Sequence, residues 1–138
     1  MLKAKGITWT VVITGNTSAE SEEVITSELI KHPDIKFVLC TGQADTEGAG
    51  LAIEKHFAGK GLTAAGFDLS PEILRLVKAG HIRWTVDQQP YVQGFYPVIQ
   101  LTQYRRYGIM PANIDAGASL VAAQQVDRVL ELSKNGYR

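Results

Sequence analysis

Short apolar runs recur along this chain and are separated by longer stretches in which apolar residues return with helical spacing. Apolar or β-branched runs of five to eight residues, bounded by glycine, proline or polar residues, are typical of buried strands. Such runs lie at residues 7–14, 36–41, 62–67 and 82–86. A last short run at residues 118–122 predicts one further strand.

The stretches between these runs carry the start and stop signals of helices. Thr17 and Glu20 have the spacing of a capping box. Ser70 and Pro71 supply a cap and a proline at the first helical position, and Gly80 supplies a stop. Helices are therefore predicted over residues 17–31, 46–57, 71–79, 91–107 and 126–133.

Strands that alternate with helices predict an α/β fold, here a parallel sheet in three layers with helices on both faces and right-handed crossovers. Ligands bind to such sheets at the carboxyl ends of the strands. Polar or glycine-containing groups follow each of the first four predicted strands. These groups are Gly15-Asn16-Thr17, Thr41-Gly42-Gln43, Asp68 and Asp87-Gln88-Gln89.

The side chains of Asp68 and Gln88 form a chemically sensible pair for a ligand covered in hydroxyl groups. A carboxylate accepts hydrogen bonds from hydroxyls, and an amide both donates and accepts them. Hydrogen bonds to charged groups are the stronger ones, at about 1.5–3 kcal/mol each. The competing interpretation is that these polar residues do no more than terminate strands and cap helices, and spacing does not decide between the two.

Composition narrows the class of protein. The 138 residues suit one domain, with 45% apolar and 20% charged residues, as in ordinary globular proteins. Fourteen basic residues balance fourteen acidic ones, which argues against nucleic-acid binding. No apolar run approaches the ~20 residues of a membrane span. The start of the chain has no apolar h-region, so no signal peptide is expected here.

Residues that could carry catalysis are sparse. Cys40, the single cysteine, falls within a predicted strand, where a buried structural thiol is expected rather than a nucleophile. His32, His56 and His81 lack the spacing of metal ligands. No phosphate-binding loop of the GxxxxGK[ST] type occurs. The chain is therefore predicted not to be an enzyme and to need neither a metal nor a cofactor.

Residues 64–101 read AAGFDLSPEILRLVKAGHIRWTVDQQPYVQGFYPVIQL and resemble the second half of periplasmic substrate-binding proteins of sugar ABC importers, the ribose-binding type. The passage HPDIKFVLCTGQ is similar to a helix-to-strand passage of that family. Gly66-Phe67-Asp68 matches its GFD strand end, and Asp87-Gln88-Gln89-Pro90 resembles its DQ.P crossing between lobes. The resemblance extends from the start of the chain to about residue 121.

The resemblance implies two α/β lobes with a sugar between them, of which this chain is the second. Residues 1–122 would form the sugar-binding lobe, residues 91–107 a helix that packs on the first lobe, and residues 123–138 a tail. The implied ligand-binding residues are Asp68, Gln88, Asn16, Gly42 and Gln43. Gln89 and Pro90 would fall at a hinge.

The departures from the family shape the remaining expectations. The first lobe, the first strand-helix unit of the second lobe and the export signal are absent from this sequence. The resemblance implies a monosaccharide or similar polyol as ligand, an ABC permease as partner of the full-length protein, and a periplasmic or extracellular location. The apolar face of residues 91–107 predicts that the chain alone is a homo-oligomer.

Two other classes of function stay open at this point. The chain resembles the effector-binding domain of LacI-type transcription regulators, which share the fold. A small flavodoxin-like enzyme or phosphate binder would use the helix N-termini that follow Gly15 or Asp68.

Overall fold

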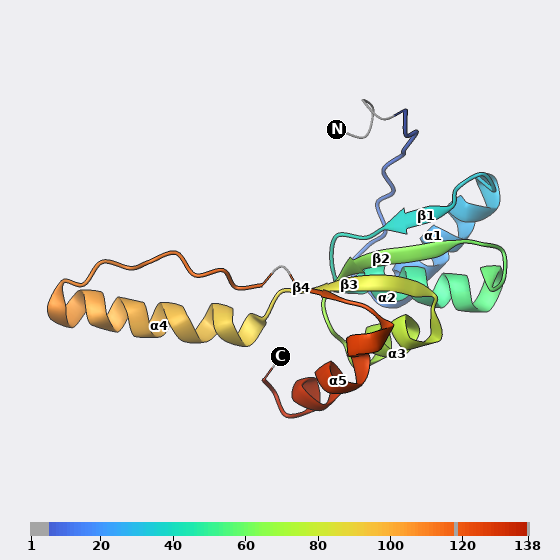
Figure 1. Cartoon of the computed structure of the whole chain (residues 1–138). Coiled ribbons are helices and arrows are strands. Elements are labelled where there is room, and N and C mark those ends of the chain that lie inside the picture. Colours follow the sequence, from blue (N-terminus) through green and yellow to red (C-terminus); the bar gives the residue numbers. More distant parts are fainter. Residues whose placement is uncertain (1–5, 118, 138) are drawn as a thin grey trace.

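The computed structural model describes residues 6–117 and 119–137 and contains one sheet of four strands, in the order β1-β2-β3-β4 (Figure 1). The first three strands are parallel to one another, and the last pairs with β3 in the antiparallel direction. The sheet thus confirms three of the four predicted parallel strands and the short final one. The strands are β1 (Phe37–Leu39), β2 (Thr63–Phe67), β3 (Ile82–Asp87) and β4 (Ser119–Val121).

Most helices begin and end where local signals place them, but the second helix begins at Gln43, before the predicted start at residue 46, and its last predicted residues form a π-helical turn. The capping box of Thr17 and Glu20 is formed at the start of the first helix. Ser70 accepts a hydrogen bond from the amide of Ile73, and Gly80 ends that helix with a left-handed φ of 85°. The helices are α1 (Ser18–Lys31), α2 (Gln43–Ala52) with a π-helical turn η2 (Ile53–Phe57), α3 (Pro71–Ala79), α4 (Pro90–Tyr107), a 3-10 turn η3 (Ala123–Gln125) and α5 (Val126–Lys134).

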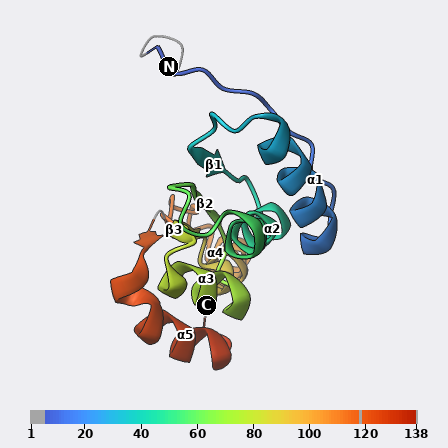
Figure 2. The same cartoon turned by 90° about the vertical axis from the view of Figure 1, so that its right-hand side faces the viewer.

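The expected helices on both faces of the sheet are not what the structure shows. Figure 2 shows α1, α2, α3 and α5 on one side of the strands, which makes two layers rather than three. The reason is topological: the strand order runs in one direction from β1 to β3, so right-handed crossovers place α2 and α3 on the same face. On the other face, Phe37, Leu39 and Leu120 are exposed.

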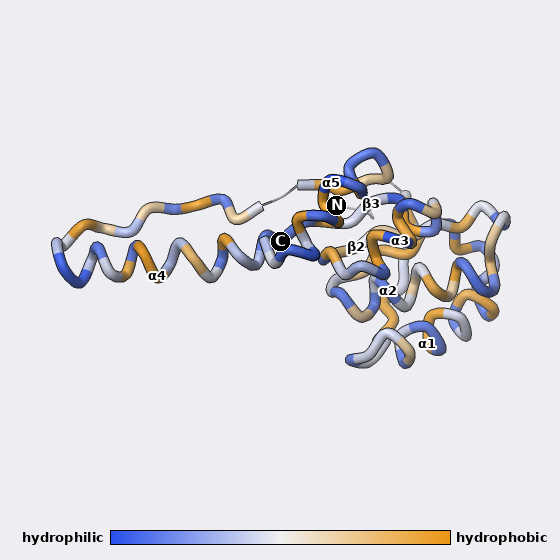
Figure 3. Tube along the Cα trace, turned by 90° about the horizontal axis from the view of Figure 1, so that it is seen from below, coloured by the Kyte–Doolittle hydropathy of each residue, from blue (hydrophilic) through white to orange (hydrophobic). Residues whose placement is uncertain are grey.

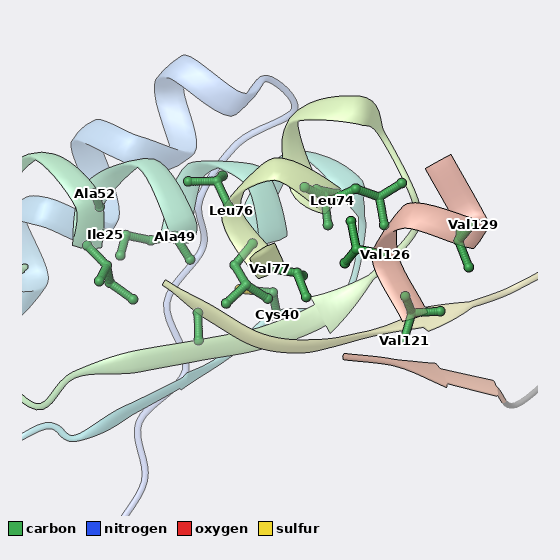
Figure 4. Packing of buried hydrophobic residues seen from close by; sticks show 14 of the residues in the cluster. Ile25, Cys40, Ala49, Ala52, Leu74, Leu76, Val77, Val121, Val126 and Val129 are labelled. Carbon is green, nitrogen blue, oxygen red and sulfur yellow. The ribbon is translucent and has the colours of Figure 1, made fainter. Parts of the chain in front are cut away.

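The core lies between this helical layer and the sheet (Figure 4). It is built from small residues of α2 and β2 and from branched aliphatic residues of α3 and α5, among them Ala49, Ala64, Leu76 and Val126. Small residues let α2 lie close to its neighbours. A Cβ added to Gly50 would come within 2.7 Å of Leu76 Cδ1, so the side chains of Leu76 and Ile82 would have to shift to admit a larger residue.

The helix predicted near the C-terminus is confirmed as α5, and it is part of this packing. Val126 and Val129 are buried in the main core. The Ser133 hydroxyl donates to the carbonyl oxygen of Leu69, at 3.4 Å. Lys78 of α3 forms an ion pair with Asp127 of α5. Packing and polar contacts together therefore hold α5 against the lobe.

The predicted strand over residues 7–14 is wrong for this structure. The segment is extended but pairs with no described strand, and Trp9, Val11 and Ile13 are 53%, 74% and 90% exposed. β-Propensity reflects how well a side chain fits a pleated, half-buried surface. High propensity is therefore not enough to form a strand, because a strand without partners is not stable. Its recorded link to the helical layer is a weak hydrogen bond from the Ser21 hydroxyl to the Thr14 carbonyl, at 3.4 Å.

Helix α4 projects from the lobe as an arm, and residues 108–117 return along it to β4 (Figure 1). None of its eighteen residues is buried. Figure 3 shows hydrophobic positions along both α4 and the returning segment. Tyr91 stacks on Phe95 at 5.7 Å between ring centroids, and Phe95 meets Tyr96 edge to face. The arm, residues 90–117, therefore presents aromatic and aliphatic surface along most of its length, and touches the lobe at its base, where Tyr91 meets Tyr137 edge to face.

Candidate functional site

A crevice of about 330 Å³ opens at the carboxyl ends of β2 and β3, where the arm leaves the lobe. This volume is at the lower end of the range for small-molecule sites, ~300–1,000 Å³. Its polar groups come from segments far apart in the sequence. The lining residues are Gln43, Asp68, Leu69, Ser70, Pro71, Asp87, Gln88, Pro90 and Ser133.

Asp68 and Gln88 meet in this crevice. Asp68 follows the last residue of β2, and its carboxylate Oδ1 accepts a hydrogen bond from Gln88 Nε2 at 2.8 Å. The main chain of Gln88 is held in turn, since its carbonyl accepts a bond from Gln93 Nε2 at 2.6 Å. The two residues that the sequence paired for a polyol therefore form a hydrogen-bonded pair on the crevice wall.

The buried carboxylate of Asp87 organises the passage from β3 into the arm. Its Oδ1 accepts a hydrogen bond from the Gln89 amide at 2.9 Å, and the residue is fully buried. Gln89 adopts a left-handed φ of 50°, which a residue other than glycine rarely does. Pro90 then starts α4. The sequence Asp87-Gln88-Gln89-Pro90 at the end of β3 therefore turns the chain out of the sheet and into α4.

The loop after β1 brings Gln43 into the crevice, with Gly42 directly before it. Asp45 fixes this loop: its Oδ2 accepts from the Thr41 amide at 2.6 Å and its Oδ1 from the Gly42 amide at 2.8 Å. The Gly42 amide is therefore engaged within the loop. Gly42 is not among the crevice-lining residues, although its neighbour is.

Asn16 lies elsewhere, at the exposed N-terminal end of α1. Its amide donates to Glu20 Oε2 at 3.2 Å, beside the capping contact of Thr17. These hydrogen bonds, first the one from the Thr17 side chain and then those from the Asn16 and Thr17 amides, lower the pKa of Glu20. The structure does not bring Asn16 into the crevice formed by Gln43, Asp68 and Gln88.

Three polar lining residues, Ser70, Asp87 and Ser133, are not among the ligand-binding residues that the sequence predicts. Ser70 was identified as a helix cap, which it is, and its hydroxyl also donates to Glu47 Oε2 at 2.8 Å. Asp87 was grouped with a polar strand end, but no signal in the sequence marked it as buried. Ser133 reaches the crevice because α5 docks beside Leu69, a contact between residues 64 positions apart.

Among the described residues, no group of three or more His, Cys, Asp or Glu side chains is placed to hold a metal ion. Within residues 6–117 and 119–137, none of the helices combines the length and apolar character needed to cross a membrane. The polar side chains that line the crevice carry carboxylate, amide and hydroxyl groups.

A family model and a curated relative both match this chain over most of its length. Residues 2–107 match the model of the periplasmic binding protein domain. The chain is 30% identical to the xylose/arabinose-binding protein XylF of Sulfolobus acidocaldarius, across 90% of this chain and 33% of that protein. It thus spans about a third of the length of this curated relative.

Solved structures agree with that match. A carbohydrate transporter from Acidothermus cellulolyticus in complex with myo-inositol is 26% identical, with a TM-score of 0.74, over 88% of this chain and 43% of that one. An ABC transporter solute-binding protein from Agrobacterium vitis with bound D-fucose is 29% identical, with a TM-score of 0.72, over 81% and 39%. The α/β lobe with a crevice at its strand ends, and the match over most of its length, identify this chain as a member of the periplasmic binding protein family.

Proposed function

We propose that the crevice beside Asp68 binds a monosaccharide or a similar polyol, as one lobe of the substrate-binding component of an ABC sugar transporter. The observation that carries this proposal is the Asp68–Gln88 pair on the crevice wall. A carboxylate keeps capacity for further hydrogen bonds after accepting one, so Asp68 can accept hydroxyls while Gln88 holds it in place. The named relatives with bound myo-inositol and D-fucose support a ligand of this class.

The sugar would lie against one wall, because this chain supplies a single lobe. Small-molecule sites commonly bury 70–90% of the ligand surface, and an open crevice encloses less. We therefore expect weak binding by the isolated chain. Gln43 and Ser70 flank Asp68 in the crevice and would add neutral hydrogen bonds.

The test is an NMR titration of the chain with xylose, arabinose and myo-inositol. Saturable shifts of the Asp68 and Gln88 signals support the proposal. Asp68→Asn should weaken binding by roughly tenfold or more, because an asparagine keeps the size and tolerates the left-handed backbone but loses the charge. Asp34→Asn, in an exposed turn after α1, is the matched control and should bind as the wild type does. Equal affinity in the Asp68 variant would contradict the proposed role.

The same titration separates the other classes of function. Shifts caused by inorganic phosphate or a flavin nucleotide at the start of α3, with none caused by sugars, would favour the flavodoxin-like alternative. Sugar binding alone would be shared with the effector domain of a regulator. Pull-down with an ABC permease, using the full-length protein that contains this lobe, would distinguish transport from regulation.

The proposal extends to location and assembly. A lobe of this kind would act in the periplasm or outside the cell, where it would deliver sugar to the permease. The isolated chain would associate with copies of itself through the arm, whose exposed Tyr91, Phe95, Val98 and Leu101 form more apolar surface than a free monomer usually leaves in water.

A further inference from the structure

The backbone of Asp68 is held in an unusual conformation. Its φ is 75°, in the left-handed region that is strained for a residue with a Cβ. Such a conformation persists where neighbouring groups determine it. Strand β3 supplies two of these groups: Val86 O accepts from the Asp68 amide at 3.0 Å, and the Thr85 hydroxyl donates to the Asp68 carbonyl at 2.7 Å.

A second hydroxyl acts on the residue just before Asp68. In β2, the amide of Thr63 donates to the carbonyl oxygen of Lys36, the residue just before β1. Amides alternate in direction along a strand, so the Phe67 amide faces the same way, beyond the end of β1. There it donates to Thr46 Oγ1 at 3.0 Å, and Thr46 in turn donates to the Gly42 carbonyl at 2.5 Å.

Both threonines are fully buried, and their surroundings leave little freedom. Gly66 lies directly against Thr46, because a Cβ added to Gly66 would clash with the Thr46 hydroxyl. The Thr46 hydroxyl therefore ties the loop that carries Gln43 to the end of β2, immediately before Asp68. Thr85 ties Asp68 itself to β3, the strand that leads to Gln88.

We infer that Thr46 and Thr85 are positioning residues of the sugar site: their hydroxyls fix the main chain on either side of the Asp68 carboxylate and hold it at the distance from Gln43 and Gln88 that the ligand needs. This inference rests on the proposed function. It requires no contact between either threonine and the sugar. Removal of a hydroxyl should then lower affinity without removing any group that touches the ligand.

The experiment compares Thr46→Val and Thr85→Val, which keep the shape and lose the hydroxyl, with Thr46→Ser and Thr85→Ser, which keep it. Affinity for xylose, arabinose and myo-inositol is measured by NMR titration of the full chain. The valine variants should raise Kd by roughly three- to tenfold, and the serine variants should bind within about twofold of the wild type.

Ser21→Ala is the control for stability alone, since it also removes a buried hydroxyl but at the packing of α1 on α2. Its Kd should stay at the wild-type value even where its unfolding midpoint falls. If the valine variants bind as the wild type does, or if Ser21→Ala raises Kd equally, the inference is wrong. If Thr46→Val does not fold, Thr85→Val, which removes a single bond to Asp68, decides the question.

Amide hydrogen exchange separates failure of this inference from failure of the proposed function. Without any ligand, Thr46→Val should speed exchange at Phe67, while Thr63 and Ala64, whose amides bond to strand neighbours, stay protected. Unchanged protection at Phe67 overturns the positioning role whatever the chain binds. Loss of protection in a chain that binds none of the three sugars supports the positioning of Asp68 and rejects the sugar proposal instead.

Discussion

Cys40 follows the end of β1 and is enclosed by its surroundings. It is 3% exposed, and its thiol donates to the carbonyl oxygen of Asp45 at 3.3 Å. Burial first, and the Asp45 carboxylate second, raise the pKa of Cys40 to about 12. Since the thiolate is the nucleophile, the thiol should be unreactive in the native chain at pH 8.

Labelling with DTNB measures this directly. The native chain should release almost no thionitrobenzoate over minutes, and the same chain in denaturant should release one equivalent. Rapid stoichiometric release without denaturant would show that Cys40 is accessible and would contradict its structural role.

Glu20 gives the lobe a pH-dependent contact at the start of α1. The hydrogen bonds from Thr17 and from the amides before the helix lower its pKa in the folded state. A lowered folded pKa means that this stabilisation is present above the unfolded value, near 4.5, and is lost as the pH falls through the folded pKa. Urea midpoints of the wild type and Glu20→Gln should therefore differ at pH 7 and converge as the pH falls below the lowered pKa of the folded state. A constant gap across that range would argue against the carboxylate as the cause.

At the scale of the elements, two glycines in helices should respond to alanine in opposite directions. A Cβ on Gly48 of α2 would lie 2.6 Å from Ser21 Cβ and 2.8 Å from the Glu22 amide nitrogen of α1. Overpacking of about 1–3 kcal/mol then outweighs the gain in helix propensity, which is about 1 kcal/mol. A Cβ on Gly94 of α4 meets nothing within 4 Å.

Gly48→Ala should thus lower the urea midpoint of the lobe, whereas Gly94→Ala should increase helical circular dichroism without lowering that midpoint. The pair controls for propensity, because both changes are the same substitution within a helix. A stabilised Gly48→Ala variant would mean that α1 can move away from α2 without cost.

Elements whose determinants are local could be predicted from the sequence. The caps at Thr17 and Ser70 act within a few residues, and the helices begin there. Asp68 and Gln88 were paired correctly because neighbouring parallel strands end at one edge of a sheet. Residues 7–14 were not predictable in the same way, since a strand requires a partner that local propensity does not supply. Ser133 was missed because its place depends on how α5 docks, a contact between residues far apart in the sequence.

The whole molecule is a two-layer lobe with an apolar arm. Light scattering at micromolar concentration should give a mass above the 15.1 kDa of one chain, since the exposed aromatic and aliphatic side chains of α4 are driven to leave water. Replacing Phe95 and Leu101 by aspartate should shift the mass toward that of a single chain. A 15.1 kDa species in the unmodified chain would contradict association through the arm, and an oligomer unaffected by the double substitution would place the contact on another surface.

Both ends of the arm meet at adjacent strands, because Asp87 at the end of β3 pairs with Ser119 at the start of β4. The arm is therefore an insertion between two adjacent strands, and its two ends lie next to each other. Replacing residues 90–116 by a short glycine-serine linker would leave the sheet and its main core in register. The lobe and the arm are therefore units that can be exchanged separately. Grafting the arm of one such protein onto the lobe of another would change the surface on which the chain docks, while Asp68, Thr46 and Thr85 stay in place.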